Sequence, residues 1–337
     1  MKGKINLILA TTCHILVDYL CIMTLFNLLN NDTPNEMRML YNILAFGTQA
    51  IIGYIVDISK NKWIGIIGAI LVSTGSLIYT NEILVIFIIG MGNAMFHVGS
   101  SLFVIDESDG RLSDLGIFVS SGAIGVGLGT ISYNRLASIV LIALSVLWGI
   151  KLGREKERLQ ERERELDFNI ASNNHGVVFI AFICIIIRAL GSGKSLCTLS
   201  GSAWIMVISI SSCVGKAFGG ILSDKFGARL IGVISMIVSM ISIGYSFVIG
   251  AVGVVISIIA FNMSMPITLG VIIDELKNYK CFGFGLTTFG LLIGSMITLF
   301  QYKLSITKNV IEMICLSGIA LVCMMYVVKG GRKENEI

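Results

Sequence analysis

The chain has little charge and almost no proline. Only 14% of its 337 residues are Asp, Glu, Lys or Arg, whereas soluble globular domains carry roughly 25%. Hydrophobic residues make up 55% of the chain, and its mean hydropathy is +0.87. This composition excludes an ordinary soluble protein and predicts an integral membrane protein. The two prolines and 37 glycines fit helices that pack closely in lipid.

Cysteines grouped for a disulfide or a metal are also missing. The eight cysteines stand singly, none of them in a CxxC pair, and nearly all lie in apolar runs. We interpret them as small hydrophobic residues and predict no metal and no cofactor. The start, MKGKINLILATTC, resembles a signal peptide, but its apolar stretch continues to about residue 29 without a small-residue cleavage site. This pattern predicts a retained first helix.

Long apolar runs of about 20 residues, the length that crosses a bilayer, divide the chain into twelve candidate spans. They lie near 5–29, 37–57, 63–80, 83–105, 114–132, 136–152, 176–197, 203–223, 228–248, 251–273, 282–301 and 307–328. We therefore expect an all-α membrane protein with two six-helix halves, 1–152 and 176–329, and a cytoplasmic tail at 330–337. Between the halves, residues 153–175 form a charged linker whose signs alternate at helical spacing, which predicts a solvated connecting helix.

The distribution of Lys and Arg predicts the orientation of these spans. With the N-terminus inside, 18 of the 25 basic residues fall in inner segments and 4 in outer segments. Because cytoplasmic loops are enriched in Lys and Arg, we expect a multi-pass protein of the plasma membrane with both termini in the cytoplasm. Three basic residues remain inside spans, namely Arg188, Lys194 and Lys216.

The two halves repeat a short pattern. After the second span, Gly53 is followed four residues later by Asp57, and after the eighth span Gly220 is followed in the same way by Asp224. In both copies a basic residue stands five positions beyond the aspartate. Repeated six-helix units are an architecture of secondary transporters, in which the substrate site lies between the halves near the middle of the membrane.

The second copy carries a more specific pattern. The stretch Gly220-x-Leu222-x-Asp224-Lys225-x-Gly227-x-Arg229 resembles the loop signature of the major facilitator superfamily. The first copy is degraded, because Ile58 and Lys60 stand where that signature has a basic residue and glycine. The resemblance implies the major facilitator fold and a cytoplasmic gate in which the two aspartates contact helix ends and basic groups and hold the outward-open state. The implied gating residues are Gly53, Asp57, Gly220, Asp224, Lys225, Gly227 and Arg229.

A closer resemblance rests on shorter motifs. His14-x-x-x-Asp18 in the first span and Phe96-His97 in the fourth are similar to the fosmidomycin-resistance-like branch of that superfamily. Val98 stands where the branch tends to have proline. The glycines of the fifth span, at 122, 125, 127 and 129, resemble a signature of drug/proton antiporters without its proline. These motifs imply drug efflux.

Ionisable residues inside spans are the candidates for chemistry, because they are costly in lipid unless they face protein or water. His14 and Asp18 share one helix face near mid-bilayer, and histidine changes charge near neutral pH. We expect both to face a water-filled cavity between the halves. The predicted proton-coupling residues are Asp18, His14 and His97.

Arg188 keeps its charge, so we expect it either to bind an anionic group of the substrate or to pair with Asp18. Together with Lys216 it makes the expected cavity net positive, which favours anionic or zwitterionic solutes. The predicted substrate-binding residues are Arg188, Lys216, Asn93 and Asn262.

Each of these residues has a structural alternative. His14 and Asp18 could form a satisfied packing pair, and His97, Asn93 and Asn262 could hydrogen-bond within or between helices. The stretch GSGKS at 191–195 lacks the earlier glycine of a phosphate-binding loop, and the spacing of the histidines and Asp18 is not diagnostic of a metal. The sequence shows no nucleophile–base pair of the kind that would indicate an enzyme.

The sequence therefore predicts a proton-coupled secondary active transporter that moves a small organic solute, with an anion favoured, by alternating access, and efflux is the expected direction. Its expected partners are the solute, protons and membrane lipid, with no nucleic acid, and we expect a monomer. A lipid flippase or a transporter-like sensor remains the alternative, and an enzyme is not expected.

Overall fold

The structure is a computed structural model that describes residues 2–28, 35–78, 81–159, 174–196, 202–300 and 306–330. These residues form helices and short connections and include no β-strand. In the first half of the chain the helices are α1 (Lys2–Met23), η1 (Thr24–Leu28), α2 (Asn35–Asn42), η2 (Ile43–Gly47), α3 (Gln49–Ser59), α4 (Trp63–Leu77), α5 (Glu82–Ser108), α6 (Leu112–Ile131) and α7 (Leu136–Leu159). In the second half they are α8 (His175–Leu196), α9 (Ser202–Phe226), α10 (Ala228–Gly244), α11 (Ser246–Ile249), α12 (Ala251–Glu275), α13 (Lys280–Phe300) and α14 (Ile306–Gly330).

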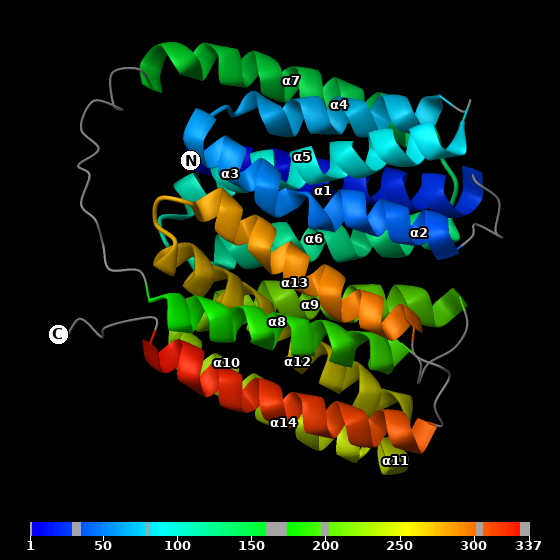
Figure 1. Ribbon diagram of the computed structural model, residues 1–337, viewed down its shortest axis with the longest axis vertical. Coiled ribbons are helices and arrows are strands. Elements are labelled where there is room, and N and C mark those ends of the chain that lie inside the picture. Colours follow the sequence, from blue (N-terminus) through cyan, green and yellow to red (C-terminus); the bar gives the residue numbers. More distant parts are fainter. Residues whose placement is uncertain are drawn as a thin grey trace.

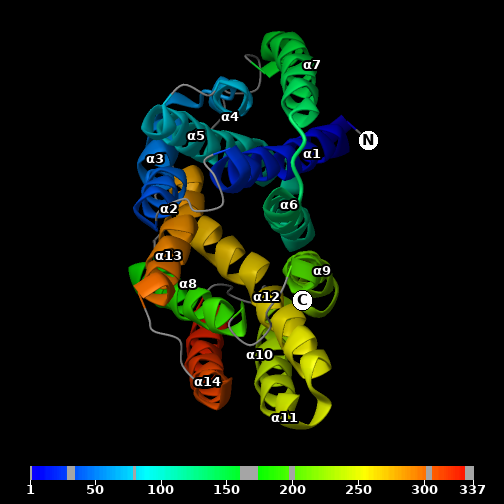
Figure 2. The same cartoon turned by 90° about the vertical axis from the view of Figure 1, so that its right-hand side faces the viewer.

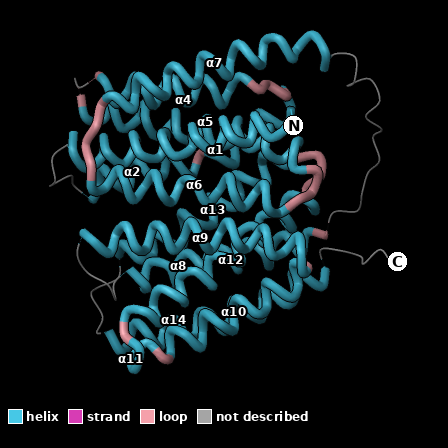
Figure 3. Tube along the Cα trace, turned by 180° about the vertical axis from the view of Figure 1, so that it is seen from behind, coloured by secondary structure: helices cyan, strands magenta, loops and turns pink. Residues whose placement is uncertain are grey.

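Every predicted span corresponds to one helix or to consecutive helices. Among the described residues, eight helical stretches are long and apolar enough to cross a membrane, and four further apolar helices are shorter. The helices lie side by side, and most of the connections gather at the two ends of the bundle (Figures 1 and 3). The prediction of an all-α membrane protein is confirmed.

Three predicted spans are not continuous α-helices, and the first of them ends in the π-helical turn η1. The second is interrupted by the π-helical turn η2, and just beyond it Thr48 and Gln49 donate side-chain hydrogen bonds to the carbonyls of Leu44 and Ala45, each at 2.6 Å. Such bonds to a carbonyl four residues earlier bend helices. The ninth span ends as α10 at Gly244, and α11 follows before Gly250, whose φ of 61° ends the helical path.

The charged linker is only partly described. Helix α7 continues past the predicted boundary at 152 to Leu159. The rest of the linker up to residue 173 and the tail from residue 331 lie outside the described residues.

The two groups of six spans follow each other along the long axis of the molecule (Figure 1). They meet mainly through two helix pairs, α6 with α9 and α3 with α13. In the view turned by 90°, these pairs lie on opposite sides of the molecule (Figure 2). The described helices α1, α5, α8 and α12 complete the centre between these pairs.

Glycines allow the close approach of both helix pairs. A Cβ atom on Gly116 of α6 would lie 2.7 Å from the carbonyl oxygen of Lys216 on α9. A Cβ atom on Gly53 of α3 would lie 2.8 Å from the amide nitrogen of Phe282 on α13. Since membrane helices associate through small residues that bring backbones together, these glycines explain why the halves join at these two seams.

Candidate functional site

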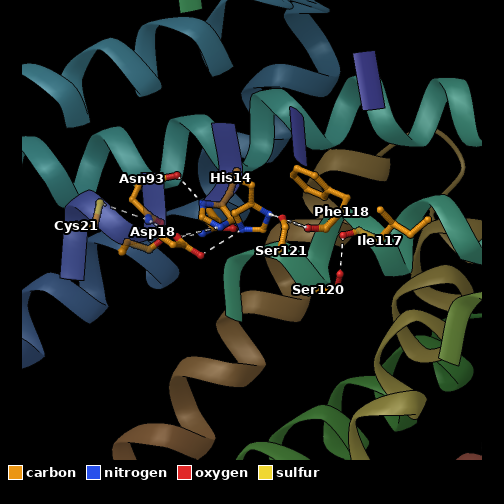
Figure 4. Close-up of polar contacts among 11 residues, drawn as sticks. His14, Asp18, Cys21, Asn93, Ile117, Phe118, Ser120 and Ser121 are labelled. Carbon is orange, nitrogen blue, oxygen red and sulfur yellow. Dashed lines mark hydrogen bonds and ion pairs between the residues drawn. The ribbon is translucent and has the colours of Figure 1, made fainter. Parts of the chain in front are cut away.

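The centre of the first half contains a cluster of polar side chains around Asp18 (Figure 4). On α1, His14 and Asp18 are one helical turn apart, and His14 Nε2 lies 3.3 Å from Asp18 Oδ2. From α5, His97 Nε2 lies 3.6 Å from Asp18 Oδ1. The three predicted proton-coupling residues therefore lie together, with one imidazole nitrogen facing each carboxylate oxygen.

Asn93 belongs to the same cluster. Its Nδ2 atom donates to Asp18 Oδ1 at 3.0 Å and to Cys21 Sγ at 3.6 Å (Figure 4). The residue is 1% exposed. Asn93 was predicted to bind substrate, but in this structure it is a hydrogen-bond partner of Asp18.

Backbone carbonyls fix the orientation of both imidazole rings. His14 Nδ1 lies 2.8 Å from the carbonyl oxygen of Phe118 on α6, and His97 Nδ1 lies 2.9 Å from the carbonyl oxygen of Asn93. A carbonyl only accepts hydrogen bonds, so we infer that each Nδ1 atom carries hydrogen. A neutral ring then has its lone pair on Nε2. Both Nε2 lone pairs then face the lone pairs of the Asp18 carboxylate oxygens. A proton placed between an Nε2 atom and a carboxylate oxygen would turn this repulsion into a hydrogen bond.

Ser121 strengthens this geometry on the α6 side. Its hydroxyl donates to the carbonyl oxygen of Phe118 at 2.7 Å and lies 3.1 Å from His14 Nδ1. The ring of His14 also contacts the rings of His97 and Phe118, with centroids 4.4 and 4.7 Å apart. The rings are thus held by their neighbours on α5 and α6.

The cluster is nearly enclosed by protein. The side chains of His14, His97 and Asp18 are 4%, 7% and 13% exposed, so the expectation that His14 and Asp18 face a water-filled cavity is wrong for this conformation. The reason lies on α6, where a Cβ atom on Gly122 would be 2.6 Å from His14 Nε2. Only glycine leaves room for α6 to cover this face of α1.

The same three side chains form the one group among the described residues that could geometrically surround a metal ion, with ligand atoms within 4.8 Å of one another. Two contacts favour a proton instead. Asn93 already donates to Asp18 Oδ1, and the α6 backbone at Gly122 closes the space beside the Nε2 atom of His14.

Arg188 lies in the second half, on α8, and is 4% exposed. Its Nη1 atom donates to Ser264 Oγ at 3.1 Å and to Thr268 Oγ1 at 3.2 Å, both on α12. The pair with Asp18 that we considered from the sequence is not formed, because the ion pairs of Asp18 within the described residues are those with the two histidines. Arg188 is instead oriented by neutral hydroxyls, and it has no carboxylate partner within the described residues.

Lys216 on α9 connects the two groups electrostatically. It interacts with Asp18 and His97 of the first half and with Arg188 of the second. Asn262 on α12 is half-buried and donates to the carbonyl of Ile258 within its own helix at 2.9 Å. Lys216 therefore interacts with both Asp18 and Arg188, whereas Asn262 makes a local contact.

Asp57 and Asp224 lie at the end of the bundle that holds the short connections 60–62, 109–111, 227 and 276–279, which we call the basic end. Asp57 accepts hydrogen bonds from the amides of Cys281 and Phe282 at the start of α13, at 3.0 and 2.8 Å. Asp224 accepts from the amides of Leu112 and Ser113 at the start of α6, both at 2.8 Å. Each aspartate thus caps a helix of the opposite half, where a negative charge is favourable.

The other predicted gating residues lie around these two caps. Gly53 and Gly220 allow the close approach of the helices, and Gly227 has a φ of 91° between α9 and α10. Neither capping aspartate has an ion pair in the described part of the chain. The ion pairs present at this end, Lys62–Asp106 at 3.8 Å and Arg111–Asp114 at 2.7 Å, both lie within the first half. Lys225 lies over the ring of Phe226, and Arg229 lines a cavity.

Sequence reasoning missed several members of the site. Gly122 was noticed only as part of a glycine-rich pattern, and nothing indicated that it covers His14. Phe118, Ser121, Ser264 and Thr268 gave no signal, because serine, threonine and phenylalanine are common in membrane helices and their partners lie on other spans.

Comparison with known proteins identifies the fold. No family model matches the sequence, and no curated protein does. Among solved structures, one of the E. coli fucose:proton symporter FucP has a TM-score of 0.67, with 11% identity, over 97% of this chain and 99% of that chain. Another, of the major facilitator superfamily transporter FucP in the outward conformation, has a TM-score of 0.62, with 12% identity, over 95% and 98%.

The chain therefore has the major facilitator fold, as its sequence predicted. These structural neighbours are transporters, not enzymes. They give no support to the closer resemblance to the fosmidomycin-resistance-like branch.

Proposed function

We propose that this protein is a proton-coupled secondary transporter that moves a small organic anion by alternating access. The observation that carries the proposal is the arrangement around Asp18, where two imidazole Nε2 atoms face the two carboxylate oxygens. The carbonyl contacts of both Nδ1 atoms prevent either ring from donating through Nε2 unless it is protonated. One proton shared between Asp18 and a histidine removes this conflict, so the cluster is suited to take up and release a proton.

Two cations within the spans of the second half, the buried Arg188 and the half-buried Lys216, support an anionic solute. Arg188 is oriented by Ser264 and Thr268, and its guanidinium can bind a carboxylate or phosphate in a bidentate manner. Lys216 interacts with both Arg188 and Asp18. Protonation of Asp18 removes the negative charge that competes with the solute for Lys216, which couples proton uptake to binding of the anion.

The two aspartate caps support a closed state at the basic end. Both caps join the halves there, and basic loops face the cytoplasm in membrane proteins. We infer that the basic end is cytoplasmic, that the chain lies in the plasma membrane as a monomer, and that release of the caps opens the cytoplasmic side. Rocking of two halves around a central site is the usual motion of such folds.

The direction of transport follows from the sign of the coupling. If protonation favours binding of the anion, proton and solute move together, and an inward proton gradient drives uptake. The resemblance of His14-x-x-x-Asp18 and Phe96-His97 favours efflux. Efflux driven by the proton gradient requires that binding of the proton and binding of the solute exclude each other. The same experiment distinguishes the two.

The test uses proteoliposomes that contain a pH-sensitive dye. They are challenged with a panel of organic anions, with cations and neutral compounds of similar size beside them. We expect an anion-dependent proton signal that Asp18→Asn abolishes and that Asp109→Asn, which replaces an exposed carboxylate between α5 and α6, leaves intact. Acidification of the lumen on addition of the anion outside indicates symport, and alkalinisation of the lumen indicates exchange.

Arg188→Lys provides the second arm. It keeps the charge but loses the planar fork, so we expect the apparent affinity for the anion to fall about tenfold or more while a proton signal remains at saturating solute. Proton coupling would be contradicted if the unmodified protein gave no proton signal while Asp18→Asn still took up the solute. Transport of cations in preference to anions would contradict the proposed substrate class.

A further inference from the structure

A cavity lies at the basic end of the second half, away from Asp18 and Arg188. Its volume is about 340 Å³, within the range of pockets that bind small ligands. The residues that line it are Leu112, Gly227, Ala228, Arg229, Ile267, Gly270, Val271, Asp274, Val328 and Lys329. It therefore lies among the start of α6, the start of α10 and the ends of α12 and α14.

The cavity is amphipathic. Ile267, Val271 and Leu112 form a buried apolar interior, with 0%, 8% and 7% exposure. The charged side chains of the lining are two cations, Arg229 and Lys329, and one carboxylate, Asp274, all of them exposed. The rim is thus net positive at the ends of α12 and α14, and we expect the ends of spanning helices to lie near lipid headgroups.

We propose that this cavity binds an anionic phospholipid from the cytoplasmic leaflet, with the phosphate between Arg229 and Lys329 and the glycerol and upper acyl carbons against the apolar interior. Charge complementarity favours an anionic headgroup, since each Lys or Arg near an anionic membrane surface contributes attraction. The apolar interior favours a lipid over a soluble anion, because a free phosphate has nothing to place there. The backbone amides at the start of α10, which follows Gly227 without a side-chain cap, face the same rim and favour the same charge.

Leu112 connects this lipid site to the Asp224 cap. Its side chain lines the cavity, and its amide donates to Asp224 at 2.8 Å. A lipid that packs against Leu112 therefore stabilises the closed basic end.

The test measures thermal unfolding of the purified full chain in a neutral detergent, with short-chain phosphatidylglycerol, short-chain phosphatidylcholine or glycerol phosphate added. We expect phosphatidylglycerol alone to raise the unfolding temperature by several degrees. In Arg229→Gln/Lys329→Gln its apparent affinity should fall about 30-fold, because each cation contributes roughly fivefold. The matched control is Lys225→Gln/Lys277→Gln, which removes the same charge from residues outside the cavity at the same end.

A second variant tests the cavity itself without changing charge. Ala228→Leu adds three carbons to a residue that lines the cavity, and it should abolish the shift although both cations remain. An equal shift from phosphatidylcholine, or an undiminished shift in the Arg229/Lys329 variant, would overturn the proposal in favour of non-specific lipid contact. An equal shift from glycerol phosphate would overturn the lipid assignment in favour of a soluble anion.

Discussion

Asp18 is held by side chains from two helices and covered by the backbone of a third. His14 approaches from its own helix, His97 and Asn93 approach from α5, and Gly122 of α6 lies against the pair. A buried carboxylate is costly unless it is paired and hydrogen-bonded. The hydrogen bond from Asn93 and the two nearby imidazoles offset this cost, so the charge of the cluster and its packing depend on each other.

The fixed tautomers of the two histidines can be observed directly. The chain has three histidines, so His175→Gln leaves only the two of the cluster. In ¹⁵N solid-state NMR of the reconstituted variant at high pH, we expect both neutral rings to carry their hydrogen on Nδ1, because each Nδ1 atom contacts a carbonyl oxygen. Signals from rings protonated on Nε2 would contradict the proposed arrangement of lone pairs around Asp18.

Gly122 controls the distance between α6 and the cluster. A methyl group there would lie 3.0 Å from His14 Cε1 and closer to the polar atoms of the pair. We expect Gly122→Ala to lower the stability of the protein by about 1–3 kcal/mol, as overpacking does, and to reduce proton-coupled transport. Thermal unfolding and the dye assay measure the two effects.

The control for Gly122→Ala is Gly153→Ala on α7. A Cβ atom at Gly153 has no neighbour within 4 Å, so alanine should be neutral or should stabilise by about 0.5–1 kcal/mol through its helix propensity. Equal behaviour of the two variants would mean that α6 does not confine the cluster.

At this scale the sequence predicted the acidic and basic members of the site but not their partners. An ionisable residue in an apolar run is conspicuous, which is why His14, Asp18, His97 and Arg188 could be chosen. The orientation of Arg188 depends on Ser264 and Thr268, which lie about 80 residues away in the chain. Nothing in their local pattern distinguishes them from other hydroxyl residues of membrane helices.

At the scale of helices, the two aspartate caps explain how each half is attached to the other. The first amides of a helix have no partner within that helix, and the carboxylates of Asp57 and Asp224 supply one for α13 and α6. A charged acceptor contributes about 1.5–3 kcal/mol per hydrogen bond. The caps are therefore strong enough to bias the closed basic end and weak enough to be released.

Hydrogen exchange measures each cap separately. We expect Asp57→Ala to accelerate exchange of the amides of Cys281 and Phe282 about tenfold or more, while the amides of Leu112 and Ser113 change less. Asp224→Ala should show the reverse pattern, so each variant is the control for the other. Mass spectrometry of peptides that begin several residues before α13 and α6 and cover their first turns provides the readout. Unchanged exchange in both variants would contradict the role of the caps.

The helices themselves were largely predictable, because the length and hydropathy of a span are local properties of the sequence. The interruption of the second span and the position at which α10 ends could not be predicted from these local properties. They arise from side-chain bonds of Thr48 and Gln49 to carbonyls of the preceding turn and from the positive φ of Gly250. Hydropathy indicates which residues are buried in lipid or protein. It does not indicate which side chains bond to backbone carbonyls or which glycine has a positive φ.

At the scale of the molecule, two seams join the halves, and both carry glycine at the basic end. The repeated Gly–Asp pattern predicted that Gly53 and Gly220 occupy corresponding places. It could not show which helix each would meet, because that depends on how the halves are placed against each other. In the structure Gly53 faces the start of α13 and Gly220 faces the start of α6.

If the halves rock as rigid bodies, a wedge at one seam must open the other. A Cβ atom on Gly220 would lie 2.8 Å from the carbonyl carbon of Leu112 and 2.9 Å from Ser113 Cα, so Gly220→Ala must push α9 away from α6. Cys281 lies at the other seam and is 0% exposed. With the remaining seven of the eight cysteines replaced, we expect Gly220→Ala to increase the reaction of Cys281 with an impermeant maleimide, added at the basic end, about tenfold or more.

Gly47→Ala is the matched control for this experiment. Its Cβ atom would meet side-chain carbons and no backbone atom, namely Leu292 Cδ2 at 3.2 Å and Ile43 Cγ2 at 3.8 Å, and it lies on the same seam as Cys281. Labelling of Cys281 should remain slow in that variant. Gly53→Ala, which acts directly on the seam of Cys281, should increase labelling whether or not the halves are rigid. Increased labelling in Gly53→Ala but not in Gly220→Ala would therefore mean that the two seams open independently, and alternating access would then require a bend within each half in place of a rocking motion between them.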